Sequence, residues 1–173
     1  MTARSVKMRR LGKDDAGHYR DLMLRAYRAH PDAFTTSVRE AKFRPVSWWA
    51  ARAGDGSPGS SLVIGAFSAS RLVGVVGLSF EAREKVRHKV RLFGMYVLPS
   101  FRGRGIGKRL VQRGLAEARR HKDARLVQLT VTEGNSDALK LYEKCGFVRF
   151  GVEPLAVAVG DKHVSKVHMW RPL

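Results

Sequence analysis

The apolar positions of the chain follow two patterns, one typical of strands and one typical of helices. Runs rich in β-branched and aromatic residues predict strands at residues 5–11, 62–68, 72–80, 90–97, 126–131, 148–159 and 162–171. Apolar residues three and four positions apart predict helices after Asp14, around Trp48 and Trp49, after Ile106 and after Asn135, with a polar connection at 34–45. The predicted order is β-α-α-β-β-β-α-β-α-β-β, without a repeat or an interdomain linker.

The most informative segment joins the strand at 90–97 to the helix that begins at Ile106. Pro99 cannot continue a strand ladder, and Gly103, Gly105 and Gly107 let the backbone approach a ligand without a Cβ in the way. The first N–H groups of the following helix have no internal partners, and with the helix dipole they attract an anion. A plain turn rarely needs three glycines flanked by basic residues, so we expect this loop to hold a diphosphate.

Two familiar glycine-rich motifs do not fit this loop. The Walker motif needs Gly-Lys followed at once by Ser or Thr, whereas Lys108 is followed by Arg109. The dinucleotide fingerprint needs Gly-x-Gly-x-x-Gly, whereas Gly103, Gly105 and Gly107 are separated by single residues. The sequence therefore disfavours both a P-loop nucleotide site and a Rossmann site.

The pattern that remains, Arg102-x-x-Gly105-x-Gly107 after a strand, resembles the acetyl-coenzyme A loop of the GNAT N-acetyltransferase superfamily. The strand at 129–131 and the helix at 135–147 match the second half of the same pattern, and the resemblance extends over essentially the whole chain. It implies the α/β (α+β) fold of that superfamily, with a mixed, splayed central sheet flanked by helices. It also implies acetyl-CoA (coenzyme A) as the cosubstrate, with no metal.

The resemblance also assigns residues to the cofactor. In this family the strand before the loop exposes an edge to the pantetheine arm, and the loop holds the diphosphate. The cofactor-binding residues it implies are Met95, Tyr96, Val97, Arg102, Gly103, Arg104, Gly105, Ile106, Gly107, Lys108, Asn135 and Tyr142. Tyr142 matches the tyrosine that protonates the departing thiolate as general acid; taken alone, it would be read as a half-buried packing aromatic. Asn135 suits both a cofactor contact and a helix N-cap.

A general base is harder to assign, because a protonated amine must lose a proton before it attacks. In family members that acetylate protein N-termini a Glu stands five residues before the Asn, and here that position is Thr130. Glu81 and Glu133 are the candidate bases, with Glu84 and His88 as further substitutes; each is also typical of a plain surface residue. Bulk water could take the proton instead. Related sequences carry an Asp-Glu pair where this chain has Ser165-Lys166, so their specificity does not transfer.

Composition sets the outer bounds. A chain of 173 residues suits one domain, residues 1–173, and no apolar run is long enough to span a membrane. The first ten residues lack the apolar core of a secretory signal, so we expect a cytoplasmic protein. Cys145 is the single cysteine and is expected to be a packing residue rather than a nucleophile.

The charge balance is unusual: 33 Lys and Arg against 15 Asp and Glu give a net charge of +18 with His neutral. The densest basic run, residues 83–91, is expected to form a hairpin or loop. The excess of positive charge fits a solvated surface, steering of coenzyme A, or contact with a polyanion.

From the resemblance we expect an acetyltransferase acting on a primary amine of a protein, a peptide or a small molecule, as a monomer or homodimer. The alternatives are a nucleic-acid- or ribosome-associated binding module without catalysis and a cofactor-sensing domain. Scarcity of acidic residues favours a protein or peptide amine, or a small acceptor with an anionic part.

Overall fold

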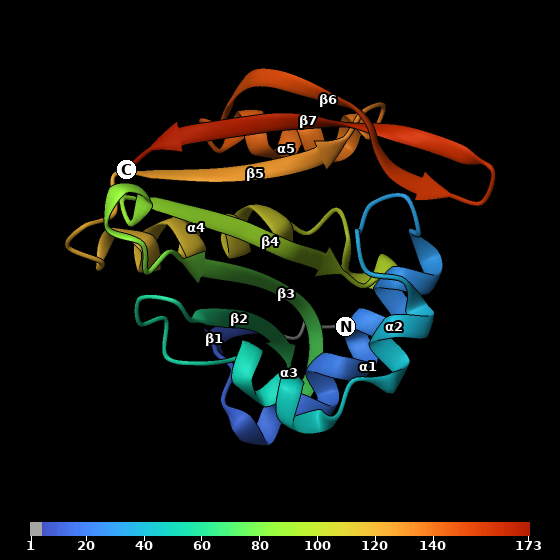
Figure 1. Cartoon of the computed structure of the whole chain (residues 1–173). Coiled ribbons are helices and arrows are strands. Elements are labelled where there is room, and N and C mark those ends of the chain that lie inside the picture. The colour runs from blue at the N-terminus through green and yellow to red at the C-terminus, as the bar shows by residue number, and fades with distance from the viewer. Residues whose placement is uncertain (1–4) are drawn as a thin grey trace.

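The computed structural model describes residues 5–173 (Figure 1). Its strands are β1 (Val6–Arg10), β2 (Ser61–Ser68), β3 (Arg71–Phe80), β4 (Lys89–Val97), β5 (Leu126–Thr132), β6 (Val148–Val159) and β7 (Lys162–Pro172). Its helices are α1 (Ala16–Ala29), α2 (Val38–Phe43), α3 (Val46–Arg52), α4 (Ile106–Arg119) and α5 (Ser136–Lys144). The predicted strands and four of these helices are confirmed. Within the described residues, no helix is long and apolar enough to cross a membrane.

The strands form one mixed sheet in the order β1-β2-β3-β4-β5-β7-β6. Neighbouring strands run antiparallel except β4 and β5, which are parallel. Helices α1, α2 and α3 lie on one side of the sheet, and α4 and α5 lie on the other (Figure 1). Tyr19 and Trp49 on the first side and Leu110 and Val111 on the second are almost completely buried. The predicted architecture, a mixed central sheet flanked by helices, is therefore confirmed.

The sheet divides between β4 and β5. These strands pair over only three positions, the last joining Arg91 to Gln128. Just beyond, Gly94 adopts φ +58°, and the register between β3 and β4 shifts opposite Val75 and Gly77. Such a bulge bends a strand away from its neighbour. The second halves of β4 and β5 therefore diverge, as the resemblance implies, and leave the facing strand edges without sheet partners.

The segment 34–45 differs from the prediction of a polar connection, because α2 occupies Val38–Phe43. Ser37 caps the helix: its Oγ accepts a hydrogen bond from the backbone N of Glu40 at 3.1 Å, and the Glu40 carboxylate accepts one from the backbone N of Ser37 at 2.9 Å. This reciprocal capping box stabilises a first turn that buries only Ala41. The prediction was wrong because a helix with one buried residue leaves almost no apolar periodicity.

A buried carboxylate links α4 to the far edge of the sheet. Glu117 on α4 is only 1% exposed, and its side chain pairs with Arg10 of β1 at 2.5 Å, with Arg113 at 3.1 Å and with Arg120 at 3.5 Å. Burial by itself raises the pKa of this carboxyl, but the arginines outweigh burial, and the pKa lies below its ordinary value. Glu117 is therefore ionised and holds α4 against β1.

Candidate active site

The loop at residues 103–108 leads into the first turn of α4, and because it was predicted to hold a diphosphate we call it the anion-binding loop. Gly103 and Gly105 adopt φ values of +73° and +71°, a left-handed conformation that favours glycine. Gly105 is the N-cap of α4 and has no side chain to cap it. Within residues 5–173, no backbone N–H of residues 103–108 donates to a protein acceptor. These unpartnered donors, at the positive end of the helix and beside Lys108, fit a diphosphate.

A cavity of about 870 Å³ follows this loop; we call it the cofactor cavity. It is lined by every residue predicted to bind the cofactor except one: Met95, Tyr96, Val97, Arg102, Gly103, Gly105, Ile106, Gly107, Lys108, Asn135 and Tyr142. The exception is Arg104, whose guanidinium carbon lies 5.1 Å from the centroid of the Phe101 ring. Arg102 also bonds the strand edge, because its Nε donates to the carbonyl of Val97 at 3.0 Å. The structure thus brings eleven of the twelve predicted residues to one cavity.

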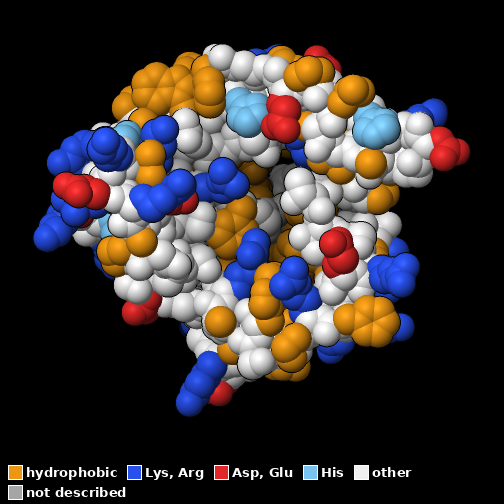
Figure 2. Space-filling view, viewed as in Figure 1, with side chains coloured by type: hydrophobic (Ala, Val, Ile, Leu, Met, Phe, Trp, Pro, Cys, Tyr) orange, Lys and Arg blue, Asp and Glu red, His pale blue; other side chains and the backbone are white. Residues whose placement is uncertain are grey.

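A second cavity, of about 400 Å³, lies between the diverging strands; we call it the acceptor cavity. Its lining comes from the loop after α1, the end of α3, strands β4 and β5, and the facing sides of α5, β6 and β7. The two cavities share Ala33, Phe34, Met95, Asn135, Ala138 and Tyr142. The molecular surface is hollowed at its centre when viewed from this side (Figure 2). The two cavities therefore form one cleft, and Tyr142 and Met95 are among the residues that line both of its parts.

Tyr142 stands where the cavities meet. Its ring is buried, packs edge-on against Phe147 with centroids 5.8 Å apart, and its hydroxyl donates to the sulfur of Met95 at 3.3 Å. Burial raises the pKa of this phenol well above its ordinary value, so it keeps its proton. Asn135 caps α5 by accepting from the backbone N of Ala138 at 3.2 Å, which confirms the predicted cap. A protonated phenol held beside the cleft can act as a proton donor.

The candidate bases lie in different places. Glu133 lines the cofactor cavity, on the side of the loop between β5 and α5. Glu81 follows β3 and pairs with Arg83 at 2.9 Å. Glu81, Glu84 and His88 line neither cavity. Trp48 and Trp49 of α3 also line neither cavity. Of the predicted bases, the structure brings only Glu133 to the cleft.

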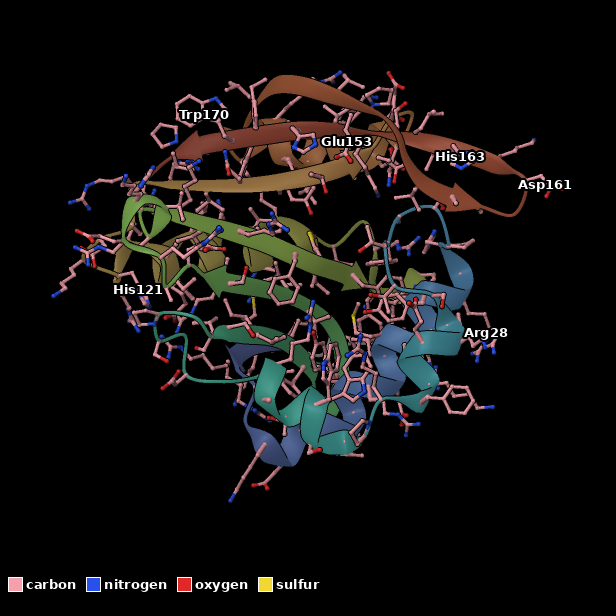
Figure 3. All side chains as sticks on the ribbon, viewed as in Figure 1. Arg28, His121, Glu153, Asp161, His163 and Trp170 are labelled. Atoms are coloured by element: carbon pink, nitrogen blue, oxygen red, sulfur yellow. The ribbon has the colours of Figure 1, made fainter. Side chains whose placement is uncertain are left out.

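A histidine–carboxylate hydrogen bond that the sequence analysis did not find lies on the wall of the acceptor cavity. His168 of β7 lies directly opposite Thr130 of β5, and its Nε2 lies 2.9 Å from the Oε2 of Glu153 on β6. Figure 3 labels Glu153, on the strand above the cleft. The polar side chains of β7 that line the cavity are at positions 166 and 168. Residues two apart on a strand share one face, so this spacing could have predicted from the sequence that both side chains face the same way.

Lys166 forms the inner part of the same wall. It is 4% exposed, and its Nζ donates to the carbonyls of Asp32 and Ala33, at 3.2 and 3.0 Å, and to Thr132 Oγ1 at 2.8 Å. These three bonds match the three donors of an ammonium group. Burial lowers the pKa of this amine. Lys166 therefore joins β5, β7 and the loop after α1, and it adds positive charge behind the cavity.

Comparison with known proteins identifies the family. The model of the acetyltransferase (GNAT) family matches residues 23–147, which is most of the chain. The chain belongs to the GNAT acetyltransferase family. Over 90 residues, or 51% of this chain, it is 39% identical to the N-alpha-acetyltransferase RimI of Mycobacterium tuberculosis. That match spans 53% of the relative, about half its length.

Solved structures show that the GNAT fold extends beyond the matched residues. A GNAT acetyltransferase from Streptococcus pneumoniae has a TM-score of 0.80 at 22% identity, covering 98% of this chain and 100% of its own. The Salmonella typhimurium protein yncA, solved with its cofactor acetyl-CoA, has a TM-score of 0.80 at 20% identity, and the match covers 98% of this chain and 94% of yncA. A ribosomal-protein-alanine N-acetyltransferase from Brucella melitensis has a TM-score of 0.75 at 21% identity, and the match covers 96% of this chain and 99% of that protein.

In this GNAT protein the wall of the acceptor cavity carries no glutamate at the position that the family resemblance matches to the general base. The position matched to the family glutamate holds Thr130, whose side chain cannot accept a proton at neutral pH. Directly across the β5–β7 pair stands His168, whose imidazole lines the acceptor cavity beside Glu153. An imidazole therefore lies one strand over from the position matched in the sequence.

Proposed function

We propose that this GNAT protein transfers the acetyl group of acetyl-CoA to a primary amine by direct attack in a ternary complex. One observation carries the proposal: the cofactor cavity and the acceptor cavity meet at Tyr142 and Met95. A donor bound along the anion-binding loop and an amine bound between the diverging strands would come together beside a proton donor. Such an arrangement needs both substrates at once and no covalent acyl-enzyme.

On the donor side, acetyl-CoA supplies a thioester, and transfer forms a C–N bond to the amine as the C–S bond breaks. The backbone N–H groups of residues 103–108 would hold the diphosphate. The edge of β4 that β5 leaves unpaired, from Met95 to Val97, offers main-chain groups for the arm and for the developing oxyanion. The Tyr142 hydroxyl would give its proton to the departing sulfur.

On the acceptor side, we propose that His168 takes the proton from the amine, directly or through water. When Nε2–H donates to Glu153, the opposite ring nitrogen, Nδ1, is left as an acceptor. The amine enters as the free base, its ammonium proton having gone to solvent. Its nitrogen then gives one proton to His168 as the amide forms, and Tyr142 gives one to the sulfur, so the protein ends with one proton gained on His168 and one missing from Tyr142. Solvent can return both groups to their starting states.

Calorimetry and thiol release test the proposal together. Acetyl-CoA and S-acetylpantetheine are titrated into the protein; the second lacks the diphosphate and should bind at least about a hundredfold more weakly if residues 103–108 hold that group. Thiol release is then followed over small amines and peptides with free N-termini, and N-acetylation of each product is checked by mass spectrometry. Equal affinity for the two thioesters would refute the loop assignment. Tight acetyl-CoA binding without thiol release on any amine would refute the transferase.

A further inference from the structure

The acceptor cavity has an unbalanced charge. Three cationic side chains line it, Arg52 at the end of α3, Arg91 on β4 and Lys166 on β7. The one carboxylate in the lining belongs to Glu153, which His168 already binds. Lys and Arg side chains gather around the central hollow (Figure 2). A cleft walled by one sign of charge favours a ligand of the other sign and repels a second cation.

Arg52 is held in place but is not neutralised. Its guanidinium carbon lies 4.2 Å from the ring centroid of Phe93 and 5.0 Å from that of Trp48. Its Nε is buried without a hydrogen-bond partner among residues 5–173, and no carboxylate of those residues pairs with it. The titratable groups beside it are the phenols of Tyr19 and Tyr27, whose pKa values burial raises, to about 12 for Tyr19. Arg52 is thus a fixed cation on the wall of an open cavity, with no carboxylate partner among residues 5–173.

The sheet is shaped to hold this arginine. Phe93 lies opposite Gly77 of β3, and a Cβ on Gly77 would lie 2.3 Å from the Phe93 ring. The missing side chain lets the ring lie flat over β3, where it supports the guanidinium of Arg52. Arg91 stands two residues before Phe93 and so projects from the same side of β4. Two guanidinium groups therefore lie on the wall of the acceptor cavity, Arg52 against the Phe93 ring and Arg91 two residues before it on β4.

We propose that the acceptor is an amine that also carries a carboxylate, and that Arg52, with Arg91, binds that carboxylate while the amine reaches the junction at Tyr142. This inference rests on the proposed function and names its substrate class. A planar guanidinium matches a carboxylate, and Arg52 lines the cavity with no carboxylate paired to it among residues 5–173. Lys166 adds to the attraction without contacting the ligand, because its own donors are already used.

The carboxylate can come from a small amino acid or from an acidic residue of a peptide, so the test has two arms. The probes are 4-aminobutyrate against 4-aminobutyramide, and the tripeptide amide Ala-Glu-Ala against Ala-Gln-Ala. Each pair differs in one carboxylate and keeps its amine. Binding to the protein loaded with coenzyme A is measured by calorimetry, and thiol release from acetyl-CoA is measured separately. We expect the acid to bind at least about tenfold more tightly than the amide in one arm, and less so at high salt.

Variants locate the effect. Arg52→Gln should reduce the acid-over-amide ratio to about threefold or less, and Arg91→Gln, at an exposed residue whose loss does not threaten folding, should reduce it partly. Arg44→Gln is the matched control: the Arg44 guanidinium carbon lies 4.4 Å from the centroid of the same Trp48 ring, but Arg44 lines neither cavity, and the ratio should not change.

The two readouts separate the two proposals. Equal binding of acid and amide in both arms, with thiol release, would overturn the carboxylate site and leave the transferase. Preferential binding of the acid, lost in Arg52→Gln, without thiol release would support the carboxylate site and overturn the transferase. A preference for the acid that survives in Arg52→Gln and Arg91→Gln would also overturn the assignment, because the carboxylate would then be bound elsewhere.

Discussion

Replacing Tyr142 by Phe removes one hydroxyl at the junction of the two cavities. Among residues 5–173 that hydroxyl has a single partner, the sulfur of Met95 at 3.3 Å, and a thioether is a weak acceptor. We therefore expect Tyr142→Phe to change the free energy of unfolding by less than about 1 kcal/mol. Because the ring stays, its packing against Phe147 stays as well. The affinity for acetyl-CoA should change little.

The effect on turnover should be much larger. A positioned general acid contributes roughly 10²- to 10⁴-fold to a rate, which corresponds to about 2.7–5.4 kcal/mol of barrier. Burial raises the pKa of Tyr142, so the parent phenol stays protonated and keeps this role through at least about pH 9. The expected signature is a fall in kcat of about a hundredfold or more with nearly unchanged stability and cofactor affinity.

The assay follows thiol release at saturating acetyl-CoA, beside urea unfolding and calorimetry on the same preparations. Phe147→Leu is the matched control, because it loosens the packing against the same ring and keeps the phenol. It should lower stability more than Tyr142→Phe does and lower kcat far less. If kcat of Tyr142→Phe stays within about threefold of the parent, Tyr142 is only a packing residue and the proton comes from elsewhere.

Three other variants test separate parts of the structure. Gly105→Val should weaken acetyl-CoA binding at least about a hundredfold, since a β-branched residue does not adopt φ +71° and its side chain would enter the space beside the loop; unchanged affinity by calorimetry would contradict the loop assignment. His168→Ala should lower kcat/KM about a hundredfold. Added imidazole should restore part of that loss in His168→Ala and none in Tyr142→Phe, whereas a purely structural role would give no rescue. Glu117→Gln should cost about 3 kcal/mol of unfolding free energy at pH 7, because Arg10 and its companions lose a buried carboxylate. The folded pKa of Glu117 lies below its ordinary value of 4.5, so this contribution is present above pH 4.5 and is lost as the pH falls through the folded pKa. Urea unfolding should therefore show the gap between parent and variant closing on acidification, and a gap that widens would contradict the ion pairing.

The cofactor side of the cleft was predictable because it is local in sequence. Residues 95–108 run from a strand edge through a glycine loop into a helix, so one continuous pattern predicts the elements and groups most of these residues at one cavity; their use in cofactor binding stays a prediction. Asn135 and Tyr142 lie seven residues apart on one short helix with its cap, and were found in the same way. The sequence could not predict that Arg104, unlike its neighbours, lies outside the lining of the cofactor cavity. A loop pattern does not tell which side chain turns away, and that of Arg104 stacks on Phe101.

The acceptor side was not predictable, because it is assembled from distant segments. His168 and Thr130 become neighbours only through the pairing of β5 with β7, and Arg52 meets Phe93 only when α3 packs against the sheet. Glu81 looked as suitable as Glu133 in the sequence, but the end of β3 lies away from both cavities. The polyanion partner, the oligomeric state and the single domain over 1–173 stay predictions.

The sequence by itself determined the strands, four of the helices, the glycine loop and the tyrosine beside it, because backbone conformation and helix-end chemistry depend on residues a few positions apart. Only the tertiary structure decided where the charges stand: that Glu117 is buried among arginines, that Lys166 is saturated by three acceptors, and that Arg52 lines the cleft with its buried Nε unpartnered among residues 5–173. Electrostatic character depends on distances and burial, and strands far apart in the chain set both when they come together in one sheet.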